Sequence, residues 1–158
     1  MREVVIDIET IPDETLMERF LPPLEVAIGN LKDPEKIAEK ERRAKQEQIE
    51  DAALDPHVAR IASIHFAETL TNNPGASATT IALWDCAIPE GPLACDTAEG
   101  YLLRDFWKYM TRVLADRESR VITFNGTTFD IPFIMRRSLI LGVKPSVNIE
   151  QGKYRTTD

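Results

Sequence analysis

The stretch that decides the fold is Val4-Val5-Ile6-Asp7-Ile8-Glu9-Thr10, a short β-branched run that predicts a buried strand ending in acidic residues. Side chains alternate along a strand, so Asp7 and Glu9 share one face, about 6.6 Å apart along the strand axis, while Ile6 and Ile8 point into apolar packing. Two neighbouring carboxylates are costly to bury unless a cation neutralises them, and Mg²⁺ and Mn²⁺ prefer oxygen ligands. The alternative is a strand end that emerges into solvent with two acids of no special role.

A second informative stretch is Val121-Ile122-Thr123-Phe124-Asn125-Gly126-Thr127-Thr128-Phe129-Asp130. It predicts a hydrophobic strand, a tight turn at Asn125-Gly126 and a helix that Asp130 opens. An acid in the first turn of a helix is favoured by the helix dipole, so a capping role is the alternative to a functional one for Asp130.

The rest of the chain predicts a mixed sheet with flanking helices, an α/β architecture. Residues 33–53 predict a long charged helix, with Asp33 as N-cap and Pro34 in the first turn, inserted into a single domain that spans residues 1–158. Strands are expected at residues 59–67, 78–84 and 120–124, a turn at residues 71–75, and helices at residues 15–20, 97–114 and 129–141.

The composition limits the classes of function. A net charge of −7 argues against a broad basic face that grips nucleic acid, but allows an enzyme that meets phosphate through divalent cations. No apolar run reaches the roughly 20 residues that span a membrane, and the N-terminus lacks the pattern of a signal peptide. Cys86 and Cys95 are too few for a disulfide framework, so reduced thiols and a cytoplasmic location are expected.

Together, the two acidic stretches resemble the DEDD superfamily of 3′→5′ exonucleases. Asp7-Ile8-Glu9-Thr10, followed about 120 residues later by Phe124-Asn125-Gly126 and Phe129-Asp130-Ile131-Pro132-Phe133, is most similar to the proofreading domain of family B DNA polymerases and to related stand-alone exonucleases. In that group, segments like Asp33-Pro34-Glu35-Lys36 and Ala53-Leu54-Asp55-Pro56 separate the first two strands. The resemblance covers nearly the whole chain.

This resemblance implies an RNase H-like fold, with three antiparallel strands, then a parallel strand, and flanking helices. It also implies a phosphodiesterase that uses two Mg²⁺ or Mn²⁺ ions, with Asp7 bridging both ions and Glu9 and Asp130 completing the ligands. The residues expected near the substrate are Thr10 and Ile11, beside the terminal base and sugar, Asn125, which supports the site or touches the terminal nucleotide, and Phe129, packed under the site.

The chain departs from the family pattern in its last part. The family has a fourth carboxylate, an aspartate four residues after a tyrosine on a late helix. Tyr154-Arg155-Thr156-Thr157-Asp158 fits that spacing, but Asp158 follows Asp130 by only 28 residues. We therefore expect a C-terminally incomplete domain, with Asp158 as the candidate fourth catalytic acid and a sheet edge that favours self-association or a partner chain.

Three functions are compatible with these observations. The first is an exonuclease that removes nucleotides from DNA 3′ ends, single-stranded ones in particular. The others are a catalytically silent RNase H-like module that binds a partner, and a related enzyme that acts on RNA. Near the presumed substrate cleft, one of Arg136 and Arg137 is expected to contact a phosphate and the other to pair with an acid.

Overall fold

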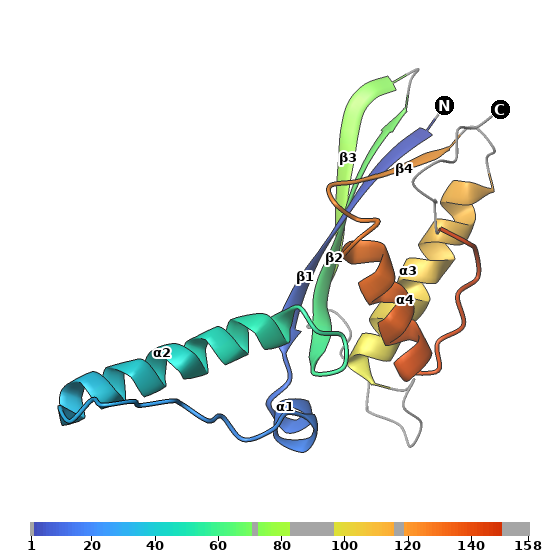
Figure 1. The fold of residues 1–158 in the computed structure, drawn as a ribbon. Helices are drawn as coiled ribbons and strands as arrows, with labels where there is room; N and C mark the ends of the chain where they lie inside the picture. Colours follow the sequence, from blue (N-terminus) through green and yellow to red (C-terminus); the bar gives the residue numbers. More distant parts are fainter. Residues whose placement is uncertain (1, 71–72, 83–96, 116–118, 150–158) are drawn as a thin grey trace. The chain divides into compact units, whose positions relative to one another are not determined.

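In the computed structural model, the strand predicted near the N-terminus is an inner strand of a four-stranded mixed sheet (Figure 1). The structure describes residues 2–70, 73–82, 97–115 and 119–149. Within them the strand order is β3-β2-β1-β4, with β1 at Arg2–Pro12, β2 at Ala59–Leu70, β3 at Asn73–Ala82 and β4 at Arg120–Thr123. The first three strands are antiparallel and β4 pairs in parallel with β1. The predicted α/β architecture is confirmed.

The chain divides into two compact units. Residues 1–9 and 61–158 form the first, and residues 10–60 form the second. The first unit contains α3 (Ala98–Leu114) and α4 (Asp130–Ile140), and the second contains α1 (Glu14–Phe20) and α2 (Pro34–Ala53). None of the helices in the described ranges combines the length and hydrophobicity that crossing a lipid bilayer requires. The single domain with an inserted helix stays a prediction.

Strand β1 alternates as its sequence predicts, but it continues to Pro12 and does not end at the acidic residues as expected. Val4, Ile6 and Ile8 are buried, whereas Asp7 and Glu9 on the opposite face are exposed. The alternation arises because successive side chains of a strand point to opposite faces of the sheet. The two acids therefore share one face of the sheet.

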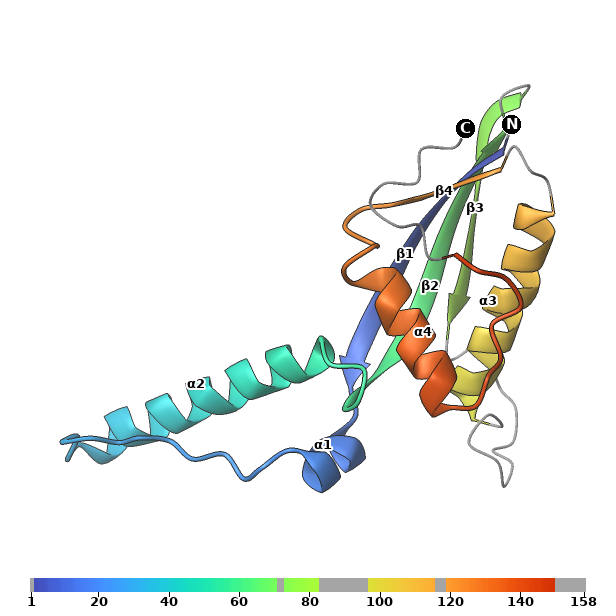
Figure 2. The same cartoon turned by 45° about the vertical axis from the view of Figure 1, so that its right-hand side comes forward.

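Helices α3 and α4 lie on one side of the sheet, where they bury its apolar face (Figures 1 and 2). Thr97 caps α3 by accepting a hydrogen bond from the Gly100 amide at 3.1 Å, as expected for a threonine at a helix start. Phe106 of α3 packs against Phe66 of β2, with 6.0 Å between ring centroids. Trp107 of α3 is buried and donates its indole N–H to Ser138 of α4 at 3.0 Å.

The predicted hairpin between β2 and β3 is confirmed, but its turn was placed wrongly. Asn73, Pro74 and Gly75 were expected in the turn, yet β3 already begins at Asn73, which pairs with Leu70. A register shift between Glu68 and Leu70 makes the pairing irregular here. Turn-forming residues are tolerated in a strand at such irregular positions, which explains the error.

The second unit contains the long charged helix that the sequence predicts. The Asp33 carboxylate accepts a hydrogen bond from the Glu35 amide at 3.0 Å, and Pro34 is the first residue of α2. In the same unit, Asp13 caps α1 and forms an ion pair with Arg60 at 3.6 Å. The hydrogen bond that caps α1 is absent from the sequence prediction, which began the helix one residue late.

Candidate active site on the first strand

Asp130 lies against the main chain of β1. It is 3% exposed, and one of its carboxylate oxygens accepts a hydrogen bond from the Ile8 amide at 3.3 Å. The pairing of β1 with β4 ends at Ile6 and Thr123, so the helix that follows β4 brings its first residue to the strand just beyond that pair. The amide that Asp130 binds belongs to the residue between Asp7 and Glu9.

The environment of the Asp130 carboxyl favours its protonated form. Burial raises the pKa of Asp130 above its ordinary value, because a charged carboxylate loses hydration there. Hydrogen bonds from its own amide and from the Ile8 amide lower the pKa, and the nearby negative charge of Asp7 raises it. A bound cation would reverse this balance by stabilising both carboxylates together.

A rigid turn connects β4 to Asp130. Asn125 has a φ of 57°, in the left-handed region that few residues other than glycine adopt. A Cβ on Gly126 would lie 2.2 Å from the Cβ of Thr123, so only glycine fits there. The carbonyl of Asn125 accepts hydrogen bonds from the amide and hydroxyl of Thr128 at 3.0 Å and 2.9 Å. The Asn-Gly turn of the sequence prediction is confirmed.

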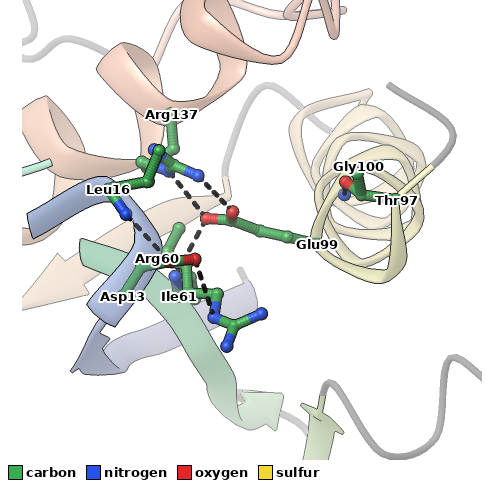
Figure 3. Close-up of polar contacts among 8 residues, drawn as sticks. All are labelled: Asp13, Leu16, Arg60, Ile61, Thr97, Glu99, Gly100 and Arg137. Atoms are coloured by element: carbon green, nitrogen blue, oxygen red, sulfur yellow. Dashed lines mark hydrogen bonds and ion pairs between the residues drawn. The ribbon is translucent and has the colours of Figure 1, made fainter. Parts of the chain in front are cut away.

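A buried ion pair holds the other end of α4 (Figure 3). The Arg137 guanidinium donates to both carboxylate oxygens of Glu99, at 2.9 Å and 2.5 Å, and all these atoms are shielded from water. The Ile61 amide of β2 also donates to Glu99, at 2.9 Å. Arg137 thus ties α4 to α3 and β2 about two turns after Asp130. One of the two arginines was predicted to pair with an acid, and this is confirmed for Arg137, whereas Arg136 is exposed.

The structure brings together only some of the acids that were predicted to bind a metal ion. Asp7 and Asp130 lie near enough for their charges to interact, and Glu9 follows on the same strand face as Asp7. In the part of the chain that the structure describes, however, no group of three or more histidine, cysteine, aspartate or glutamate side chains converges as a metal site. The oxygen donors suit Mg²⁺ or Mn²⁺ in chemistry, and Asp7 is the acid whose charge acts on Asp130.

The other predicted site residues have different surroundings. Asn125 is exposed and its side-chain oxygen accepts a hydrogen bond from Thr128, while Phe129 is half-buried against Phe133 with 5.5 Å between ring centroids. In the second unit, Thr10 donates its hydroxyl to the Ala53 carbonyl at 2.7 Å, and Ile11 is exposed. Asp158, like Tyr154 before it, lies outside the described residues. The substrate contacts of these residues stay predictions.

Replacing Asp130 with asparagine should stabilise the metal-free protein near neutral pH. The raised pKa means that the folded state binds the proton more tightly than the unfolded state, so ionisation of Asp130 costs stability as pH rises from the ordinary aspartate pKa through the raised one. Asparagine keeps the acceptor for the Ile8 amide without the charge. The advantage of Asp130→Asn should therefore be full above the raised pKa and fade as pH falls to the ordinary value.

Urea denaturation with EDTA at several pH values measures this difference. Glu3→Gln, which removes an acid from the beginning of the same strand, serves as the control for the loss of one negative charge. Equal stability of the wild type and Asp130→Asn at every pH would contradict the burial of an ionised carboxylate at this position.

Comparison with known proteins adds one finding to this geometry. A family model described as a predicted 3′-5′ exonuclease related to the exonuclease domain of PolB matches residues 54–157, more than half of the chain. The comparison with curated proteins gives no match. The matched range contains Asn125 and Asp130, whereas Asp7 and Glu9 lie before it.

Proposed function

Because the chain belongs to a family of predicted 3′-5′ exonucleases related to the exonuclease domain of PolB, we propose that it removes nucleotides from the 3′ ends of single-stranded DNA by metal-dependent hydrolysis. The family supports a nuclease function in general terms. The mixed four-stranded sheet with its helices is consistent with the α/β, RNase H-like fold of such an exonuclease. The reaction and the substrate are our proposal.

The observation that carries the proposal is the hydrogen bond from the Ile8 amide to Asp130. It joins an acid from α4 to a strand that presents Asp7 and Glu9 on either side of the same amide. Like charges at such proximity destabilise one another and raise the cost of ionising Asp130. Such a costly grouping of carboxylates is useful where cations bind, and less so on a strand without a function.

We propose Asp7, Glu9 and Asp130 as the residues that hold Mg²⁺ or Mn²⁺. When bound, such ions would act as Lewis acids toward the phosphate and lower the pKa of water. The protein contributes the placement: the Ile8 amide fixes one oxygen of Asp130, and the strand fixes Asp7 on its exposed face. Asp158, or an acid from another chain, is the proposed fourth carboxylate.

One observation favours a second candidate, a catalytically silent RNase H-like module that binds a partner. The described residues contain no convergent group of three possible metal-binding side chains, so exposed side chains such as Asp7 and Glu9 would have to rotate for a complete site. Rotation of an exposed side chain is a small change, because exposed rotamers exchange within nanoseconds. We therefore favour the exonuclease.

The proposal is tested by incubating the protein with Mn²⁺ and a 5′-labelled single-stranded DNA oligonucleotide. We expect a ladder that shortens progressively from the 3′ end and stops when EDTA is added. A circular single-stranded DNA, which has no 3′ end, should resist and distinguishes an exonuclease from an endonuclease. An RNA of the same sequence tests the alternative substrate, and preferred cleavage of that RNA would overturn the choice of DNA.

Absence of cleavage by a sample with the circular dichroism and cooperative unfolding of a folded protein would favour the silent module. A Mn²⁺ series up to millimolar concentration belongs to the experiment, so that weak metal binding is not mistaken for absence of activity.

A further inference from the structure

Phe124 is the most exposed large hydrophobic residue that the structure describes, at 94%. It directly follows β4, which ends at Thr123, and precedes Asn125. A phenylalanine that remains in water after folding contributes no burial of its own, since apolar surface stabilises a fold only when it is removed from water. Its side chain is therefore available to a ligand.

The parallel register places Phe124 beside the candidate site. Ile6 pairs with Thr123, and one residue further along the two strands come Asp7 and Phe124. Paired strands are about 4.8 Å apart, so the main chains are close at Ile6 and Thr123, directly before these two residues. Two residues earlier on the same strands, Val5 pairs with Ile122. Both side chains are partly exposed, at 42% and 43%. An apolar strip thus leads along the sheet to the carboxylates.

Local contacts fix the turn that follows Phe124. Asn125 holds a left-handed conformation, and Thr128 ties its carbonyl with two hydrogen bonds. Gly126 is packed so closely on Thr123 that no side chain fits. Strained main chain of this kind persists only when its surroundings fix it, and it occurs preferentially at ligand sites. Phe129, after the turn, packs on Phe133 instead.

We propose that Phe124 is a stacking platform for a nucleobase near the 3′ end of single-stranded DNA, an inference that rests on the function proposed above. An unpaired base has two aromatic faces, and proteins that bind single strands hold such bases on exposed aromatic side chains. A scissile phosphate at Asp7 and Asp130 would bring a neighbouring base within reach of the adjacent strand. With a net charge of −7, this chain has little general attraction for the phosphate backbone, so stacking should account for much of the affinity.

The test compares wild type, Phe124→Ala and Phe124→Trp in binding a fluorescein-labelled single-stranded DNA by anisotropy, with Ca²⁺ in place of Mn²⁺ to slow hydrolysis. We expect Phe124→Ala to weaken binding about 10-fold and Phe124→Trp to restore it, because a larger ring also stacks. Leu139→Ala is the matched control: Leu139 is 81% exposed on α4, and its loss should leave the dissociation constant unchanged.

Oligonucleotides with one abasic position, moved step by step from the 3′ end, identify the stacked base. When the abasic position replaces the stacked base, the wild type loses the stacking contact that Phe124→Ala already lacks. The two proteins should then bind that oligonucleotide equally. In cleavage with Mn²⁺, the alanine variant should raise KM about 10-fold and leave kcat within about twofold, as expected for a residue that binds substrate without touching the reacting atoms.

Equal binding by wild type and Phe124→Ala, with wild-type cleavage intact, would overturn the stacking role and leave the proposed function standing. Absence of both DNA binding and cleavage in the wild type would overturn both. A change of oligomeric state in Phe124→Ala by sedimentation, without a change in DNA affinity, would show instead that the strip is a protein interface and would also overturn this inference.

Discussion

Replacing Asp7 with alanine should reduce Mn²⁺-dependent shortening of DNA 3′ ends by at least about 100-fold. Loss of a residue that merely supports a metal ligand costs about 10–100-fold in affinity or activity, and loss of a ligand should cost no less. The fold should remain, because Asp7 is exposed on β1 and its removal relieves repulsion with Asp130. The stability of the metal-free variant should equal that of the wild type or slightly exceed it.

The rate of ladder formation on a 5′-labelled oligonucleotide measures the effect on activity. Glu3→Ala is the matched control, because it removes the same charge from the same strand face, about 13 Å from Asp7 along the axis. This control should cleave at the wild-type rate. Comparable rates in Asp7→Ala and Glu3→Ala would show that the charge of Asp7 has no special role.

The largest effect on stability is expected for Arg137→Ala. It would leave Glu99 buried without a cation, with only the Ile61 amide among its described donors. Breaking a buried ion pair by removing one partner costs about 3–5 kcal/mol. Since single domains are stable by roughly 5–15 kcal/mol, the variant should unfold at a markedly lower urea concentration than the wild type.

Two further variants separate the ion pair from the loss of packing. Arg136→Ala, at the exposed neighbouring position, should change stability by no more than about 0.5 kcal/mol. The double variant Glu99→Gln with Arg137→Met should recover a large part of the loss, because a neutral amide replaces the uncompensated charge and an apolar chain fills the space. Equal urea midpoints for Arg137→Ala and Arg136→Ala would contradict the buried pair.

The elements that local chemistry controls could be predicted from the sequence. The alternation of β1 follows from its period of two, the start of α2 follows from the cap at Asp33, and the range of α3 follows from its apolar face. The Asn125-Gly126 turn is also local. Sequence order alone then places Asp130 at the beginning of a helix, as observed.

The remaining features depend on contacts between distant residues. Glu99 sits in the first turn of α3, where an acid is favoured by the helix dipole, so nothing local indicates its pairing with Arg137. Phe124 belongs to an apolar run that predicts burial, yet β4 ends one residue earlier and the ring is exposed. Whether Glu9 approaches Asp130 depends on side-chain rotation, which periodicity does not determine.

Calorimetric titration of Mn²⁺ into the wild type, Asp7→Ala and Glu3→Ala tests the proposed metal site most directly, because it requires no turnover. We predict saturable binding by the wild type and Glu3→Ala, and none detectable by Asp7→Ala under the same conditions. Unchanged Mn²⁺ affinity in Asp7→Ala would contradict the metal site and, with it, the catalytic role proposed for these carboxylates.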